Sequence, residues 1–313
     1  MKVLARCALI LLIVGTPDAA SSDALIANTQ ARSDQTIAAL SQMSDADSLA
    51  AAGLMSIGNN TDPSLPFLAR ATAAAPDRVD LVWLRATRCA QLPPCDPAPI
   101  ERRLRELDPT NGAGWWGALG RAGAAHDAEG TDVALAAISH AERLDMYWTT
   151  LIAHLSRAVA KTKQMSLEES EVAVIGYLAA LPMPAYQYVS SSCKGERLQQ
   201  PQVTAVCRGV AKALQNGDTY LTEMIGVAIA KRVWSEESAE WRAAAEARRV
   251  YDYRSEFYSK LTQRALTHPA EYLTLCAQNR REQDALAAQL SAAGYDPNPP
   301  AAEPATSRIP ASR

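Results

Sequence analysis

Two aligned stretches decide the fold: residues 75–90, APDRVDLVWLRATRCA, and residues 108–123, DPTNGAGWWGALGRAG. Three residue types coincide at an offset of 33 positions: Pro76 with Pro109, Trp83 with Trp116, and Arg88 with Arg121. Self-similarity at such a period is typical of repeat proteins in which each unit is a pair of helices. The stretches therefore predict stacked helical hairpins.

A second series of helix starts is offset from the first. Asp62-Pro63 and Asp96-Pro97 lie 34 positions apart, and Gly130-Thr131 follows at a similar distance. Asp or Thr at an N-cap satisfies a free backbone N–H, and proline at the first helical position presets φ. Each period thus holds two helices.

The segment PIERRLREL, residues 99–107, shows the amphipathic pattern of these helices. Its apolar side chains recur at the three- and four-residue spacing of one helix face, and its charges form opposite pairs at four-residue spacing. The apolar face contains Ile100, Leu104 and Leu107, and the expected ion pairs are Glu101 with Arg105 and Arg102 with Glu106.

The hairpins resemble the tetratricopeptide repeat. The resemblance rests on the period, on the small-residue helix SLPFLARATAAAP ending at Pro76, and on a large aromatic residue in each first helix. Leu84 and Thr87 stand where that family has Gly and Tyr, and the similarity covers residues 43–160. It implies a helical superhelix whose inner surface binds a peptide or protein.

The second half is also helical but has no regular period, and no strand-like alternation occurs in the chain. The predicted fold class is all-α, with tetratricopeptide-like hairpins over residues 21–165 and an irregular helical bundle over residues 166–296. Residues 182–192 are expected to form a long connection at the boundary between helical layers. Residues 297–313, rich in Pro and Ala, are expected to be a disordered tail.

The first 20 residues have the pattern of a secretory signal peptide. Lys2 and Arg6 precede an apolar run, which is followed by small residues at Ala19 and Ala20. The run is shorter than the roughly 20 residues of a membrane span, and no later segment reaches that length. The sequence thus predicts an exported protein, periplasmic or alternatively secreted, with no transmembrane segment.

The charge balance is slightly acidic. The chain has 31 Lys and Arg residues against 34 Asp and Glu residues, a net charge of -3. Nonspecific nucleic-acid binding requires a strong basic field, so we expect no nucleic-acid partner.

The cysteines favour disulfides, as expected for an exported protein. Cys89 and Cys95 flank the turn AQLPP between predicted helices, and Cys193 with Cys207 forms a second predicted pair. A redox motif fits poorly because five residues separate Cys89 from Cys95, and a zinc site would need further ligands nearby. Cys276 is left unpaired, or alternatively replaces one member of the second pair.

No catalytic, cofactor or metal site is predicted. The chain contains no Gly-x-Ser-x-Gly, phosphate-loop or His-Glu-x-x-His motif. The segment AAGLMSIG at residues 51–58 resembles the Gly-Leu-Met segment of lytic transglycosylases, but the general-acid Glu upstream is missing. His126-Asp127 has the order of a catalytic dyad but no visible nucleophile, and His140 and His154 fit helix edges.

Trp115 and Trp116 form the candidate binding surface. Adjacent residues on a helix point about 100° apart, so with Trp116 in the core, Trp115 is expected to reach the inner surface. The leading hypothesis is a non-enzymatic module that binds a protein or peptide of the cell envelope. The alternatives are an envelope-acting enzyme or accessory subunit with a site built from distant residues, a ligand or metal carrier, and simple core packing of the tryptophans.

Overall fold

The protein is all-α in a computed structural model that describes residues 19–57, 63–183, 185–257 and 268–300, with side chains from residue 29 onward. No strand occurs among these residues, and the predicted fold class is confirmed. The expected signal peptide lies mostly outside the described residues, and so does the tail from residue 301. No helix in the described part is long and apolar enough to cross a membrane.

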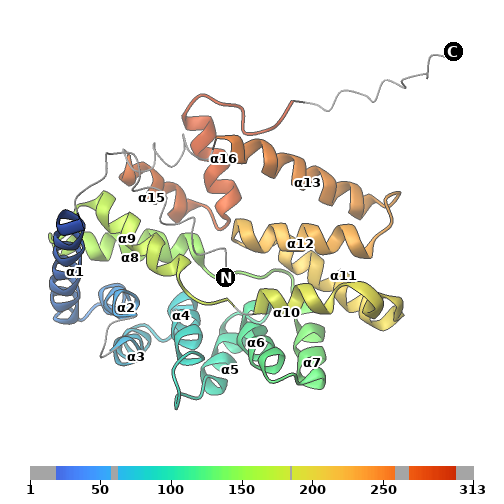
Figure 1. Cartoon of the computed structure of the whole chain (residues 1–313), viewed down its shortest axis with the longest axis horizontal. Helices are drawn as coiled ribbons and strands as arrows, with labels where there is room; N and C mark the ends of the chain where they lie inside the picture. Colours follow the sequence, from blue (N-terminus) through green and yellow to red (C-terminus); the bar gives the residue numbers. More distant parts are fainter. Residues whose placement is uncertain (1–18, 58–62, 184, 258–267, 301–313) are drawn as a thin grey trace.

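The first helices follow an arc along the lower edge of the molecule (Figure 1). They are α1 (Ala19–Ser41), α2 (Ala46–Met55), α3 (Ser64–Ala74), α4 (Val79–Cys89), α5 (Ala98–Leu107), the short 3-10 turn η2 (Gly112–Trp115), α6 (Trp116–Ala124) and α7 (Ala128–Ser139). Neighbouring helices α2 with α3, α4 with α5, and α6 with α7 pack as hairpins. Trp83 and Trp116 lie in the first helix of their hairpins, as predicted.

The remaining helices lie above this arc (Figure 1). They are α8 (Trp148–Lys161), α9 (Leu167–Ala179), α10 (Ala185–Ser192), η3 (Gly195–Gln199), α11 (Pro201–Gln215), α12 (Tyr220–Val233), α13 (Ala239–Glu256), α15 (Pro269–Gln278) and α16 (Glu282–Ala292). Helix α8 packs against α2, and α10 packs against α6. The chain therefore covers much of the inner side of its own arc.

Two sequence predictions about element boundaries are wrong. Helix α7 begins at Ala128 and not near Thr131, because the Asp127 carboxylate accepts a hydrogen bond from the Gly130 N–H and caps the helix earlier. Residues 185–192, expected to be part of a long connection, form helix α10. Tertiary packing stabilises this short helix, since Tyr186 and Val189 are buried against the rest of the chain.

A buried carboxylate joins the two halves of the chain. Asp218, before α12, accepts hydrogen bonds from the backbone N–H groups of Met146 and Trp148, both at 2.8 Å. Between these two residues, Tyr147 adopts a left-handed backbone conformation, with φ of 58°. The Tyr147 hydroxyl donates to Asp108 at 2.8 Å. The contact ties the α7–α8 connection to the start of α12.

Candidate functional site

A cleft opens between α4, α5 and α6, with a volume of about 220 Å³. The α9–α10 connection lines its remaining side through Pro182 and Met183. Most of its surface is apolar. The other lining residues are Trp83, Ala86, Thr87, Ala90, Gln91, Glu101, Leu104, Ala113, Trp116, Gly117, Gly120, Arg121, Ala124 and Ala185.

Small side chains create the space between the helices. Ala86 and Ala90 line the cleft from α4, and Gly117, Gly120 and Ala124 line it from α6. These residues leave room that larger side chains would fill. The alanine- and glycine-rich faces of the hairpins thus leave a cavity here instead of a close helix contact.

An ion pair with a buried carboxylate lies in the wall of the cleft. The Arg121 guanidinium donates from Nη1 and Nη2 to the two carboxylate oxygens of Glu101, each at 2.7 Å. Glu101 is buried and Arg121 is 40% exposed along its side chain. Gly117 permits this approach, because a Cβ there would collide with Glu101 Oε1. Glu101 is the one carboxylate among the described lining residues.

This geometry corrects the ion pairs predicted for residues 99–107. Glu101 pairs with Arg121 of α6 and not with Arg105 of its own helix. Arg105 instead lies over the ring of Trp115, with its guanidinium carbon 4.3 Å from the ring centroid, and donates to the Gly114 carbonyl at 2.9 Å. A buried bidentate partner and an aromatic face both stabilise arginine more than a solvated helix pair does.

Trp116 lies in the protein core at the edge of the cleft. Its side chain is 6% exposed and meets Tyr186 of α10 edge to face, with ring centroids 4.9 Å apart. The indole Nε1 is buried without a hydrogen-bond partner. A buried N–H without an acceptor lowers the stability of the fold by about 1–3 kcal/mol. The favourable contribution of Trp116 therefore comes from the packing of its ring and not from its N–H.

Trp115 lies on the other side of α6, in an open groove between α6 and α7. The groove has a volume of about 420 Å³ and is lined by Trp115, Ala118, Arg121, Ala122, Ala125, Asp127, Gly130, Val133 and Ala134. Val133 is 56% exposed there. Trp115 is half-buried beneath Arg105. The structure therefore separates the two predicted tryptophans, one into the cleft and one into the groove.

Arg121 lines both hollows. Its bidentate contact with Glu101 uses one N–H of Nη1 and one of Nη2. A guanidinium has five N–H donors, so three remain for a ligand that crosses α6. The sequence identified Arg121 only as the residue that aligns with Arg88 in the repeat. That alignment was the one indication that Arg121 has a structural or binding role. Arg88 donates to Ser64 Oγ at 3.0 Å and, unlike Arg121, is buried.

Both predicted cysteine pairs lie at disulfide distance. Cys89 and Cys95, with Cα atoms 5.3 Å apart, join the end of α4 to the segment before α5, next to the cleft residues Ala90 and Gln91. With both sulfurs bonded to each other, neither can be a zinc ligand in the oxidised chain. The bond restrains one wall of the cleft.

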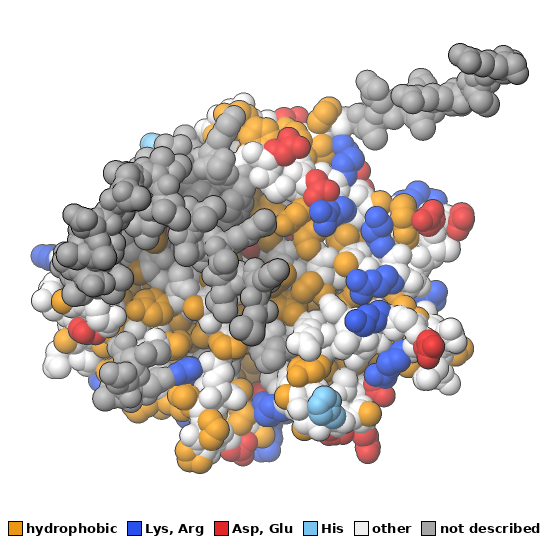
Figure 2. Space-filling model, in the orientation of Figure 1, with side chains coloured by type: hydrophobic (Ala, Val, Ile, Leu, Met, Phe, Trp, Pro, Cys, Tyr) orange, Lys and Arg blue, Asp and Glu red, His pale blue; other side chains and the backbone are white. Residues whose placement is uncertain are grey.

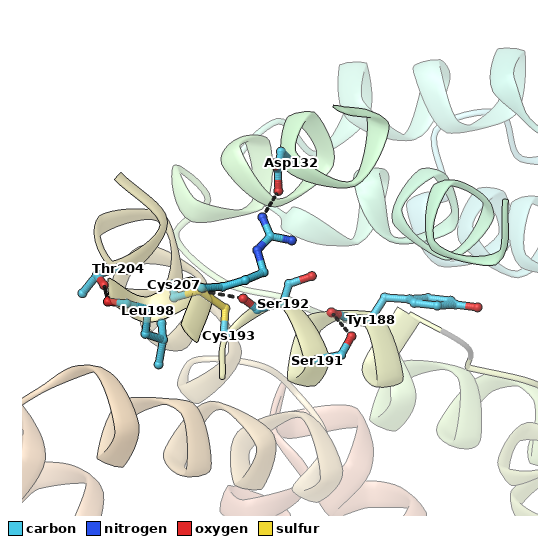
Figure 3. Close-up of a disulfide and its surroundings, with 9 residues drawn as sticks. Asp132, Tyr188, Ser191, Ser192, Cys193, Leu198, Thr204 and Cys207 are labelled. Atoms are coloured by element: carbon cyan, nitrogen blue, oxygen red, sulfur yellow. Dashed lines mark hydrogen bonds and ion pairs between the residues drawn. A yellow bond between two sulfur atoms is a disulfide. The ribbon is translucent and has the colours of Figure 1, made fainter. Parts of the chain in front are cut away.

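The second bond restrains the opposite wall. Cys193, directly after α10, is joined to Cys207 of α11, with Cα atoms 5.6 Å apart (Figure 3). The loop that it closes contains η3, whose Arg197 forms an ion pair with Asp132 of α7 (Figure 3). Cys276 is buried as a free thiol, and burial raises its pKa to about 12. A thiol with such a pKa is protonated and unreactive at neutral pH.

The histidines named in the sequence do not form a site. His126 and Asp127 are exposed in a turn, where Asp127 caps α7. His140 ends that helix, and His154 Nδ1 lies 3.3 Å from Asp47. No group of three or more metal-ligating side chains occurs within the described ranges.

No protein family, curated protein or solved structure matches this chain.

Proposed function

We propose that this chain is an exported, periplasmic binding module without catalytic activity of its own, which holds a segment of another envelope protein across α6. The expected signal peptide and the two cysteine pairs at disulfide distance support export. Secretion beyond the envelope is the alternative location. The helical hairpins, interpreted as tetratricopeptide-like, support a binding role by analogy with that fold.

The observation that carries the proposal is the position of Arg121 between two apolar hollows on opposite sides of α6. Each hollow offers a tryptophan and small apolar side chains, whereas the ridge between them offers free guanidinium donors. A peptide meets this arrangement when one apolar side chain enters the cleft, a backbone carbonyl accepts from Arg121, and a second apolar side chain lies on Trp115 and Val133. The cleft volume of about 220 Å³ suits a single large side chain.

The two disulfides support recognition through preorganisation. The first bond lies at the end of α4 and the second at the end of α10. Both helices, together with the segment before α10, line the cleft. A site whose walls are fixed before binding loses less conformational entropy on association. The polar groups of the cleft do not favour an enzyme, because its single described carboxylate is already paired with Arg121.

In-vivo photo-cross-linking from a probe at residue 122 in the groove tests the proposal, with mass spectrometry of the linked products from the envelope. Two substitutions block the hollows while leaving the core intact: Ala124→Phe in the cleft and Val133→Glu in the groove, both at exposed helix positions. The matched controls are Ala73→Phe on α3 and Val172→Glu on α9, where Val172 is 50% exposed.

We expect one dominant cross-linked partner. Its cross-linking yield should fall at least ten-fold in both site variants and stay unchanged in both controls. A partner captured equally by all four variants would show that α6 does not bind it. Recovery of the monomer alone from every variant would contradict a protein-binding role.

A further inference from the structure

A second surface, outside the α6 hollows, gathers positive charge around the end of α12. Its cations come from two helices that pack together: Arg208 and Lys212 on α11, and Lys231 and Arg232 on α12. All four side chains are exposed. Figure 2 shows Lys and Arg side chains gathered over this flank of the molecule, where Figure 1 places α11–α13.

Two tryptophans lie among these cations. Lys212 Nζ is 5.8 Å from the ring centroid of Trp234, and Lys231 Nζ is 4.9 Å from that of Trp241. Arg208 Nε donates to the Val233 carbonyl at 3.1 Å, which places it beside the same helix end. We call this surface, consisting of Arg208, Lys212, Lys231, Arg232, Trp234 and Trp241, the basic aromatic patch.

The cations of the patch lack acidic partners. No described carboxylate lies within ion-pair distance of Lys212, Lys231 or Arg232, although Glu236, Glu237 and Glu240 are exposed nearby in sequence. The neighbouring helix α13 behaves differently, since its Arg248 and Arg249 are paired with Asp252 and Glu246. No ion pair among the described residues therefore neutralises these three cations, although the whole chain carries a net charge of -3.

Stabilisation of α12 alone does not explain the patch. Basic residues in the last turn of a helix interact favourably with its macrodipole, which accounts for Lys231 and Arg232. The same effect accounts for Lys212 in the last turn of α11, and Arg208 bonds to the carbonyl end of α12, but neither contact gives a reason for the two half-buried indoles beside these cations. The combination of unpaired cations with amphipathic indoles needs a different explanation.

We propose that the basic aromatic patch docks this protein on a membrane surface that contains anionic phospholipids. Lysine and arginine near such a surface are attracted to its negative potential, each by about 1 kcal/mol. Tryptophan rings prefer the headgroup region, where the apolar ring is sheltered and the indole N–H stays hydrated. Charge complementarity and the indoles together favour a lipid surface over a soluble acidic protein.

Vesicle co-sedimentation tests this inference with the chain purified after export, so that any leader has been removed. The vesicles contain either phosphatidylcholine alone or phosphatidylcholine with 30% phosphatidylglycerol, at low and high salt. We expect binding only to the anionic vesicles, and at least ten-fold weaker binding in 0.5 M salt because the charges are then screened.

The patch variant Lys212→Gln/Lys231→Gln/Arg232→Gln is compared with the control Arg70→Gln/Arg102→Gln/Lys194→Gln. The control removes the same charge from exposed positions outside the patch. We expect roughly 100-fold weaker partitioning for the patch variant, because three cations at about 1 kcal/mol each correspond to about two powers of ten, and little change for the control. An equal loss of vesicle binding in both variants would overturn the proposal. Binding of the native protein to vesicles of pure phosphatidylcholine as strongly as to the anionic vesicles would overturn it as well.

A further experiment with a soluble polyanion distinguishes binding to lipid from binding to other anionic ligands. Inorganic polyphosphate is added to the protein without vesicles and in competition with them. Tight binding of polyphosphate in the absence of vesicle binding would also overturn the proposal, because the patch would then recognise a soluble anion. Trp241→Ser is expected to weaken vesicle binding at unchanged charge, whereas a purely electrostatic surface would leave it unaffected.

Discussion

At the scale of single residues, Arg121 shows how tertiary contacts replace local ones. Its counterpart in the preceding hairpin, Arg88, likewise donates to a buried group of another helix, Ser64 of α3. Glu101 has an arginine four positions away in its own helix, yet it bonds to Arg121 across the interface. The reason is geometric, since Gly117 lets the carboxylate approach the guanidinium in a bidentate arrangement.

Glu171 should make the stability of the protein depend on pH. This α9 side chain is 1% exposed and its Oε2 has no hydrogen-bond partner, so desolvation raises its pKa to about 8. Because the folded-state pKa lies above the unfolded one, folding binds a proton between about pH 4.5 and 8, and stability falls as pH rises through that range. Relative to the native chain, Glu171→Gln should therefore gain stability with rising pH.

Urea unfolding from pH 5 to pH 8 measures this effect. We expect the stability difference between Glu171→Gln and the native chain to shift by about 1–3 kcal/mol in favour of the variant over that range. Glu129→Gln, which removes an exposed carboxylate from the first turn of α7, should show no such shift. Parallel pH profiles for Glu171→Gln and the native protein would mean that the carboxyl is ionised and solvated.

The sequence revealed the tryptophans and cysteines of the candidate site but not its charges. Trp115, Trp116 and Cys89 are rare residue types at noticeable spacings, so a single sequence reveals them. Glu101 and Glu171 belong to helices with many similar charges. Their burial depends on which helix packs opposite them, and residue spacing within one helix carries no information on that partner.

At the scale of helices, the contact between α6 and α10 depends on a glycine. A Cβ at Gly123 would collide with the ring of Tyr188, whereas a Cβ at Gly176 in α9 would meet nothing within 4 Å. Gly123→Ala should therefore push α10 away and destabilise the protein by about 1–3 kcal/mol. Gly176→Ala should stabilise it by about 0.5–1 kcal/mol, because alanine is the better helix former.

Thermal and urea unfolding of both glycine variants tests whether the free energy of unfolding changes in opposite directions. The same substitution at two helical glycines changes composition equally, so only the surroundings differ. If Gly123→Ala were as stable as Gly176→Ala, the packing of Tyr188 on α6 would be wrong, and with it the position of α10 beside the cleft.

The disulfides can be tested by intact mass with alkylation before and after reduction. For the exported chain without Cys7, we expect one alkylated thiol, Cys276, before reduction and five cysteines alkylated after it. Removing Cys193–Cys207, with a separation of 14 residues, should cost about 3 kcal/mol. Removing Cys89–Cys95, with a separation of 6, should cost about 2 kcal/mol because a shorter loop loses less entropy. More than one free thiol in the oxidised protein would contradict the pairing.

Helix existence was predictable from sequence, whereas helix ends and short helices were not. The amphipathic pattern of residues 99–107 predicts α5 over most of its length. In contrast, α7 begins earlier than predicted because the Asp127 cap wins over the Gly130-Thr131 pair. Helix α10 has only 8 residues, too few for a clear periodic signal, and it forms through burial of Tyr186 and Val189 against other elements.

At the scale of the whole molecule, the all-α class followed from the sequence, but the closure of the arc did not. A run of hairpins predicts an open inner surface, yet α8 and α10 pack against α2 and α6 from that side (Figure 1). The contacts responsible join residues far apart in sequence, such as Trp83 with Tyr147 and Trp116 with Tyr186. A periodic pattern within single helices carries no record of such a pairing.

Asp218 provides a test of how the two halves of the chain are coupled. Its carboxylate binds the N–H groups of Met146 and Trp148, and its own carbonyl accepts from the Glu282 N–H at 2.8 Å. It therefore connects the α7–α8 segment, the start of α12 and the start of α16. Asp218→Ala leaves both N–H groups without their acceptor in a buried site, and we expect a loss of about 2–4 kcal/mol.

Hydrogen exchange locates the consequence of that loss. If Asp218 couples the halves, Asp218→Ala should increase exchange in residues 144–150, 218–224 and 282–286 together, and the unfolding transition should broaden as the halves become less cooperative. Asp132→Asn, which weakens an exposed ion pair, should leave both readouts unchanged. Increased exchange confined to residues 146–148 would mean that Asp218 stabilises only a local turn, and the halves would then be held together by their apolar contacts alone.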